Sequence, residues 1–464
     1  MEVIIILVFV VGYLAIALEH PIKVNKTASA LLTGVLCWTL FIMSSPSEGV
    51  LQGKEFLNFL ETLKLELSPE KFVSLTVLDQ YHEFVGSALG LHLAQISSIL
   101  FFLLGAMTIV ELVDAYQGFR LITDRIQTKS PVKLLWLVCW VTFFLSSILD
   151  NLTTSIVMVS LIRKLIPEKE MRMFFAGMIV IAANAGGAWT PIGDVTTTML
   201  WIGGQISTFN IMEKLFIPSV LCMLVPLVYL TFTLKGTLGE TPNPSHDNLG
   251  YGHEKIKGSA VMLFLGVGAL VFVPVFKTVT HLPPYIGMLL GLGVLWVVSE
   301  LINPHADEAL RKPYTAAGAL QRIDTSSVLF FLGILLAVGA LEAMTTLHHF
   351  AGWLDTTVGS QPVIVTLIGL LSAVIDNVPL VAASMGMYSL DAYPMDHFIW
   401  EYLAYCAGTG GSILIIGSAA GVAVMGMEKI DFIWYMKRIS LIAMLGYFAG
   451  CGAYLLIEHF MGAY

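Results

Sequence analysis

The chain is predicted to be an all-α polytopic membrane protein, and its composition and apolar runs predict this class. Of its 464 residues, 56% are hydrophobic and only 12% are charged, whereas a soluble domain carries about 25% charged residues. The mean hydropathy is +0.81. Apolar runs of about 18 or more residues recur along the chain, and each is long enough to cross a bilayer of roughly 30 Å. The net charge of −9 excludes a basic nucleic-acid surface.

About 10 membrane spans are expected, together with two hairpins. The N-terminal run lacks a small-residue cleavage site, so we expect it to be the first span and not a removed signal peptide. The polar segments 46–90 and 303–323 are expected to be extramembrane loops, the first with room for an amphipathic helix. The predicted spans are 2–19, 27–45, 93–116, 172–205, 213–235, 259–276, 284–302, 325–347, 398–427 and 432–458.

The first hairpin is predicted at about 132–165 because this apolar stretch is basic on both sides. Lys and Arg concentrate in cytoplasmic loops, so a segment with two basic flanks enters the membrane and returns. Asp150 and Asn151 stand at its centre and are expected at the hairpin tip. A carboxylate in hydrocarbon is costly, so an intramembrane Asp is a functional hypothesis by default.

The second hairpin is predicted at about 360–395, with Asp376 and Asn377 at its tip. Its flanks carry acidic residues, and no Lys or Arg occurs between Arg322 and Lys429. Both ends are therefore expected outside, and Pro379 suits the first turn of the helix after the tip. For each hairpin, the alternative is a pair of kinked or overlong spans.

The two halves of the chain resemble each other. The Asp-Asn pairs lie 226 positions apart, and the segment that begins at Gly186 resembles the one that begins at Gly410, 224 positions later. Because the hairpins open to opposite sides, the repeat is expected to be inverted, with a substrate site between the repeats at the midplane. The predicted organisation is a first repeat at 1–235, a cytoplasmic linker at 236–258 and a second repeat at 259–464.

Glycine and proline are expected to break the helices at about 172–205 and 398–427. Glycine inside a helix costs about 1 kcal/mol relative to Ala, and proline about 3 kcal/mol. Unwound backbone is tolerated at membrane depth only where it lines protein or a wet cavity, and there it can bind ions. The alternative is that these glycines allow close helix packing.

The expected site lies where the two tips meet the two broken helices. Its polar groups are hard oxygen donors, which suit a small hard cation. No Lys or Arg lies in the predicted membrane core to pair with the aspartates, so their counter-charge is expected to be a proton or a metal cation that comes and goes. The expected cation- and proton-binding residues are Asp150, Asn151, Thr154, Asn184, Asp194, Thr196, Thr197, Ser372, Asp376, Asn377 and Ser412, with Na⁺ at Asp150, Asp194 and Asp376.

Three further acids are candidates for a proton relay: Glu111, Asp114 and Glu342. They lie in or near the spans that precede the hairpins, and the alternative is that each is an interfacial carboxylate at a helix end. The chain has no Gly-rich phosphate loop and no nucleophilic triad. We therefore expect no enzyme activity, no nucleotide and no cofactor, and transport that runs on ion gradients.

At these residues the chain resembles the NhaD-type sodium/proton antiporters. The Asp-Asn tips, the segment from Asn184 to Asp194 with its two following threonines, and the Gly-Thr-Gly-Gly-Ser segment that ends at Ser412 carry the resemblance. That family belongs to the ion transporter superfamily, with the arsenite exporters and dicarboxylate transporters. The resemblance implies two repeats with re-entrant hairpins, a homodimer, an elevator motion, and exchange of Na⁺ or Li⁺ for H⁺.

The predicted function is therefore a secondary cation/proton antiporter, multi-pass in the cell inner (plasma) membrane. Dicarboxylate relatives carry Ser where this chain carries Asp at the tips, which argues against a dianionic substrate. An exporter of arsenite, another metalloid or another oxyanion stays open as the alternative. Arsenite is an uncharged hydroxide at neutral pH, so aspartates do not repel it.

Overall fold

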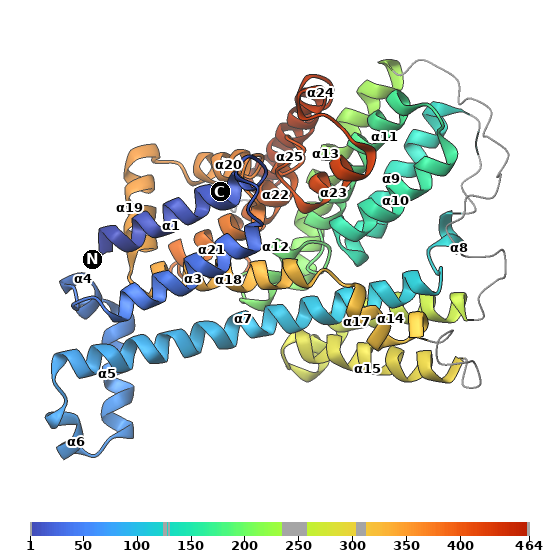
Figure 1. The fold of residues 1–464 in the computed structure, drawn as a ribbon. Coiled ribbons are helices and arrows are strands. Elements are labelled where there is room, and N and C mark those ends of the chain that lie inside the picture. Colours follow the sequence, from blue (N-terminus) through green and yellow to red (C-terminus); the bar gives the residue numbers. More distant parts are fainter. Residues whose placement is uncertain (1, 124–127, 129, 234–257, 303–311, 462–464) are drawn as a thin grey trace. The chain divides into compact units, whose positions relative to one another are not determined.

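The computed structural model describes residues 2–123, 128, 130–233, 258–302 and 312–461, and the linker predicted at 236–258 falls almost wholly outside them. The described residues form helices and no strands (Figure 1). In the first half, the helices are α1 Glu2–Ala17, α2 Glu19–Ile22, α3 Lys26–Ile42, α4 Glu48–Leu51, α5 Lys54–Glu66, α6 Pro69–Ser74, α7 Val77–Ala115, α8 Arg120–Thr123, α9 Pro131–Leu149, α10 Asn151–Leu165, α11 Lys169–Ala188, α12 Val195–Ile202 and α13 Thr208–Thr233. In the second half, they are α14 Ser259–Thr280, α15 Pro284–Ile302, the 3₁₀ turn η1 Lys312–Tyr314, α17 Ala316–Arg322, α18 Thr325–Ala343, α19 Thr346–Val358, α20 Gln361–Leu371, α21 Asn377–Met387, α22 Phe398–Gly410, α23 Ala419–Glu428, α24 Phe432–Arg438 and α25 Ser440–Met461.

Among the described residues, 8 helices are long and apolar enough to cross a membrane, or up to 9 if one bent pair counts as a single span. The predicted class, an all-α polytopic membrane protein, is confirmed. The number of spans is lower than the expected 10 in the described residues, and the boundary that differs most is at α7. Helix α7 begins at Val77, within the segment expected to be a loop, and continues for 39 residues. The first turns of α7 carry polar residues, and for this reason the sequence predicts a loop there. Polar composition does not exclude a helix, because a helix depends on its backbone hydrogen bonds.

The described chain divides into two compact units, and the first comprises residues 1–100, 324–364 and 378–394. Within it, α3 packs along α18 and α1 packs on α3. Glycines allow the close contact, since a Cβ on Gly34 would lie 2.5 Å from the carbonyl oxygen of Gly333. The indole Nε1 of Trp38 donates to the carbonyl oxygen of Leu336 at 2.8 Å, which fastens the same pair of helices.

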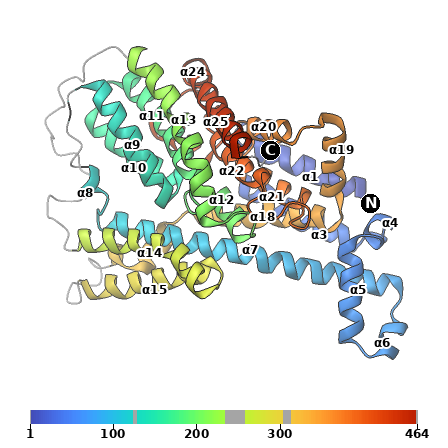
Figure 2. The same cartoon turned by 180° about the vertical axis from the view of Figure 1, so that it is seen from behind.

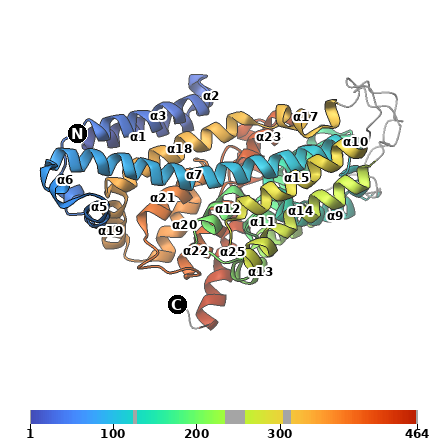
Figure 3. The same ribbon diagram turned by 90° about the horizontal axis from the view of Figure 1, so that it is seen from below.

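The second unit comprises residues 101–323, 365–377 and 395–464. Within it, α9, α10 and α11 lie side by side, as Figures 1 and 2 show, and α10 also packs against α23. Helix α13 lies along α25, and α22 packs against α11, α13 and α25. Helices α14 and α15 form a further pair (Figure 3).

Both helix breaks occur where the sequence predicts them. The first separates α11 from α12 at residues 189–194, and the second separates α22 from α23 at residues 411–418. The residues before the second helix of each pair have the same role: Asp194 caps α12 by accepting from the N–H of Thr196, and Ser418 caps α23 by accepting from the N–H of Gly421. The expected start of a helix just before Pro379 is also confirmed, because α21 begins at Asn377.

The sequence left two alternatives for the glycines: a break in the helix or close packing between helices. The structure has both. A Cβ at Gly186 would collide with the carbonyl oxygen of Phe143 on α9, and a Cβ at Gly410 would collide with the carbonyl oxygen of Gly369 on α20. Each glycine therefore lets the broken helix touch the backbone of the neighbouring helix, α9 for Gly186 and α20 for Gly410. The helix breaks begin within a few residues of these glycines. The close contact at each glycine therefore places the unwound backbone beside the predicted tip.

This contact predicts the effect of one added methyl group. Gly186→Ala should destabilise the protein by about 1–3 kcal/mol, the usual cost of overpacking, because backbone atoms block the new Cβ. Gly268→Ala on α14 is the matched control, since no atom lies within 4 Å of its added Cβ and Ala favours a helix. The measurement is the thermal denaturation midpoint of the purified protein in detergent, and equal midpoints for both variants would contradict the assignment.

Candidate functional site

Asp194 lies at the centre of the predicted site. It is 2% exposed and stands just before α12. Its Oδ1 accepts the backbone N–H of Thr196 at 3.0 Å. Its Oδ2 accepts the side-chain amide of Asn151 at 2.9 Å and that of Asn377 at 3.4 Å. The amides of the two predicted tips therefore converge on one carboxylate oxygen.

Asn184 extends this network from the first broken helix to the second. Its Oδ1 accepts from the Nδ2 of Asn151 at 3.1 Å, and its own Nδ2 donates to the Oγ of Ser418 at 3.1 Å. Asn184 is fully buried, and Ser418 is the residue that caps α23. One continuous set of hydrogen bonds therefore joins a hairpin tip and both helix breaks.

The first tip is held in a strained backbone conformation. Asp150 has φ 110° and ψ 159°, a region that side-chain-bearing residues avoid at a cost of about 1–3 kcal/mol. Its carboxylate holds the turn, because Oδ1 accepts the N–H of Thr153 at 2.8 Å and Oδ2 accepts the hydroxyl of Thr153 at 2.8 Å. Asp150 thus ends α9 and caps α10.

The second tip presents Asp376 next to the same centre. Asp376 is partly exposed and immediately precedes α21. Both Asp376 and Asp150 act electrostatically on Asp194. Among the described residues, no three Asp, Glu, His or Cys side chains come close enough together to hold a metal ion. A cation at Asp194 therefore needs oxygen atoms from amide, hydroxyl or backbone groups as well as carboxylates.

The hydroxyl groups around the site divide into two sets. Ser146 donates to the carbonyl oxygen of Ala183 at 2.7 Å, and Ser372 donates to that of Ala407 at 2.8 Å, so each fastens a hairpin helix to a broken helix. The hydroxyls of Ser412 and Thr197 likewise donate to nearby backbone oxygens. In the described structure, the buried hydroxyls without a hydrogen-bond partner include Thr154, Ser155 and Thr196.

The three acids predicted as a proton relay lie in different surroundings. Glu111 pairs with Arg322, with 2.5 Å between Oε1 and Nε, which fits a structural ion pair. Asp114 is exposed on α7. Glu342 lies within the first unit, where its Oε2 is 3.1 Å from the position a Cβ on Gly386 would occupy. A relay through these acids stays a prediction.

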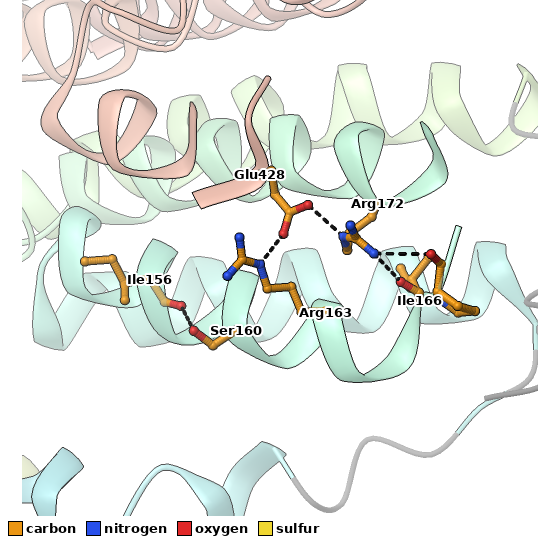
Figure 4. Close-up of polar contacts among 7 residues, drawn as sticks. Ile156, Ser160, Arg163, Ile166, Arg172 and Glu428 are labelled. Atoms are coloured by element: carbon orange, nitrogen blue, oxygen red, sulfur yellow. Dashed lines mark hydrogen bonds and ion pairs between the residues drawn. The ribbon is translucent and has the colours of Figure 1, made fainter. Parts of the chain in front are cut away.

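The sequence analysis missed an ion cluster at the far end of the helices that carry the site (Figure 4). Glu428 ends α23, and its side chain is 1% exposed. Its two oxygens accept from the Nε of Arg163 on α10 and the Nε of Arg172 on α11, each at 2.6 Å. Arg172 also donates to the carbonyl oxygen of Ile166 at 3.0 Å. We call these three charged residues the Glu428 clamp, and it ties together α10, α11 and α23.

A chain with span-length helices, two broken helices and a buried carboxylate between them is a membrane transporter by class. It belongs to the family whose model is described as the citrate transporter family, which matches residues 13–408. The predicted resemblance to NhaD-type antiporters is confirmed by the relatives, and these are transporters and not enzymes.

Two plant relatives cover nearly the whole chain. "Sodium/proton antiporter 1" of Arabidopsis thaliana is 50% identical over 98% of this chain and 72% of its own length. "Sodium/proton antiporter 2" of the same plant is 44% identical over 98% of this chain and 99% of its own length. A bacterial relative, "Na(+)/H(+) antiporter NhaD" of Vibrio cholerae, is 29% identical over 98% of this chain and 91% of its own length.

Removing the charge at the centre of the Glu428 clamp should destabilise the second unit. Glu428→Gln leaves two guanidinium groups facing a neutral amide. Breaking a buried ion pair costs about 3–5 kcal/mol, and the partial exposure of Arg163 lowers the expected cost to about 2–3 kcal/mol. The thermal midpoint of the purified protein measures the loss. Glu168→Gln, an exposed change at the start of α11, is the control and should leave the midpoint unchanged.

Proposed function

We propose that the chain exchanges Na⁺ or Li⁺ for H⁺ across a membrane. The observation that carries the proposal is the carboxylate of Asp194, buried and held by amides from both hairpin tips. An ionised carboxylate is costly in an apolar interior unless a counter-charge accompanies it. The ligand that supplies this counter-charge is the transported species.

The surroundings of Asp194 suit a small cation. Within the described part of the chain, no Lys or Arg pairs with Asp150 or Asp194. The nearby groups are carboxylate, amide and hydroxyl oxygens, which are hard ligands. The buried hydroxyl of Thr154 has no hydrogen-bond partner in the described structure, and the side chain of Thr196 acts on Asp194 itself.

The same carboxylate can couple two ions. A protonated Asp194 has no net charge and no longer attracts Na⁺, whereas an ionised Asp194 attracts Na⁺ and is then neutralised by it. Proton and cation therefore compete for one group, and each neutral form crosses the apolar barrier at lower cost than the bare charge. Competition at a single site produces exchange without any cofactor. The printed names of the relatives, which are sodium/proton antiporters, support this assignment.

We propose that the two halves are inverted repeats, with re-entrant hairpins at about 132–165 and 360–395. The matched helix breaks and the matched bonds of Ser146 and Ser372 support the repeat. The proposed transport cycle is an elevator motion of the packet of helices that carries Asp194, in a homodimer of the cell inner (plasma) membrane. The Glu428 clamp supports movement as one body, because it ties together three helices of that packet.

The family description names citrate, but the negative charges of the site disfavour the binding of citrate. Citrate carries several negative charges at neutral pH, and the described site offers Asp150, Asp194 and Asp376 with no basic partner for the first two. Like charges in a low-dielectric interior repel strongly. An uncharged metalloid hydroxide is not repelled by these carboxylates. Arsenite export is therefore the alternative function if the exchange of cations is not observed.

The decisive variant is Asp194→Asn. Everted vesicles that hold a proton gradient should lose it on addition of Na⁺ or Li⁺, while K⁺ and citrate should have no effect. In Asp194→Asn the rate of exchange should fall by at least about tenfold, since a binding loss of about 1.4 kcal/mol is tenfold. The fluorescence of a pH-gradient dye follows the exchange.

Asp391→Asn is the matched control, because Asp391 is exposed in the loop after α21 and should leave exchange unchanged. Two outcomes contradict the proposal. One is a gradient that neither Na⁺ nor Li⁺ dissipates. The other is full exchange by Asp194→Asn. Arsenite resistance on expression without any Na⁺ response would instead assign the metalloid function.

A further inference from the structure

A second group of buried charges lies in the second unit, away from Asp194. It forms where α13, α22 and α25 pack against one another. Glu401 on α22 and Glu458 on α25 are both 0% exposed. The Nζ of Lys214 on α13 lies 2.9 Å from Oε1 of Glu458. The Nδ2 of Asn210, one turn before Lys214, donates to Oε1 of Glu401 at 2.5 Å.

The charges of this group do not balance. Two carboxylates face one ammonium group, because Asn210 is neutral and the hydroxyl of Tyr454 donates to the carbonyl oxygen of Phe398 instead. Burial, together with the nearby Lys214, lowers the pKa of His397 although Glu458 opposes the shift, so the imidazole is neutral at pH 7 and adds no positive charge here. With both carboxylates ionised, the group would hold one excess negative charge in the interior. A buried charge without a partner costs several kcal/mol.

Three carboxylate oxygens of the group have no hydrogen-bond partner in the described structure: Oε2 of Glu401 and both oxygens of Glu458, of which Oε1 faces the ammonium of Lys214. Oε2 of Glu401 is buried and has no hydrogen-bond partner in the described structure, whereas Oε1 is held by Asn210. Three converging Asp, Glu, His or Cys side chains, which would favour a metal ion here, are absent from the described residues. The chemistry of the site therefore suits a proton, which needs one oxygen and no coordination shell.

We propose that Glu401, with Glu458 and Lys214, forms a second proton-binding site that is separate from Asp194. One proton on this group neutralises its excess charge, and Oε2 of Glu401 is the atom proposed to carry it. The charged and titratable groups that act on Glu401 are Lys214 from α13 and Asp396 from the loop before α22. Glu458 and Tyr454 from α25 complete the surroundings. Helices α11 and α12 also pack on α22; α12 carries no charged residue, and the charged residues of α11, Lys169, Glu170 and Arg172, lie in its first turn.

The position of Glu401 gives the site a way to act on transport. Helix α22 begins near Glu401 and ends at Gly410, next to the second break. Nine residues of helix separate the two, or about 14 Å. A change of charge at Glu401 therefore acts at one end of a rigid element whose other end borders the site of Asp194. This effect on transport rests on the proposed exchange, whereas proton binding itself does not.

Infrared spectroscopy of the purified full-length protein without Na⁺ tests proton binding directly. A protonated carboxyl group absorbs apart from carboxylates, so the wild-type protein should show a band that Glu401→Gln removes. Glutamine keeps the size of the side chain and the acceptor for Asn210. Glu458→Gln is the second variant and should also change the band, because it leaves Lys214 to balance Glu401 and so removes the excess charge that the proton neutralises. Glu213→Gln, an exposed change beside Lys214, is the control and should keep the wild-type spectrum.

The dependence of exchange on pH separates this proposal from the proposed function. Glu401→Gln should keep Na⁺-dependent exchange and lose one protonation step from its pH profile. If the wild-type spectrum persists in both Glu401→Gln and Glu458→Gln, the second proton site is overturned, whatever the exchange rate. If the band is present and Na⁺ and Li⁺ dissipate no gradient, the proton site stands and the proposed exchange fails.

Discussion

The arrangement of the second unit depends on the need to keep a carboxylate in an apolar interior. Asp194 meets this need with donors from three segments: the backbone of Thr196 and the amides of Asn151 and Asn377. These segments can converge only if a continuous helix stops at the same depth as the two tips. The helix breaks, the two tips and Gly186 therefore all serve to bring hydrogen-bond donors to the buried carboxylate of Asp194.

The two halves of the chain share the same kinds of helix contact but differ in the charge of the residue that caps the second helix of each broken pair. The fastening bonds of Ser146 and Ser372 correspond, and so do the close approaches at Gly186 and Gly410. At the equivalent helix caps, however, the chain has Asp194 in one half and Ser418 in the other. A second carboxylate here would repel the first across a short distance in a low-dielectric interior. The matching contacts of the two halves thus hold the helices together, and the difference between the caps leaves a carboxylate at the first break and a hydroxyl at the second.

Charges elsewhere in the chain also serve internal contacts. Lys214 and Lys277 each have a partner inside the second unit. Lys214 pairs with the buried Glu458, and the Nζ of Lys277 donates to the carbonyl oxygen of Trp201 at 3.0 Å. Arg163 and Arg172, which helped to predict the first hairpin, are likewise joined by Glu428. The position of a basic residue can therefore reflect an acidic or carbonyl partner inside the fold, and not only the side of the membrane on which the residue lies.

The sequence by itself predicted the class and the helix breaks, and it named the residues that meet at Asp194 as the candidate site. Local chemistry decides these features: apolar length predicts spans, glycine and proline interrupt helices, and an Asp or Asn in an apolar run must have partners. Only the tertiary structure decided that Asp194 is the centre, because its donors come from residues up to 183 positions away. The Glu428 clamp and the buried partners of Glu401 and Glu458 were also not predicted from the sequence. Each of these acids stands alone in its own helix, and its partners are set by how distant helices pack.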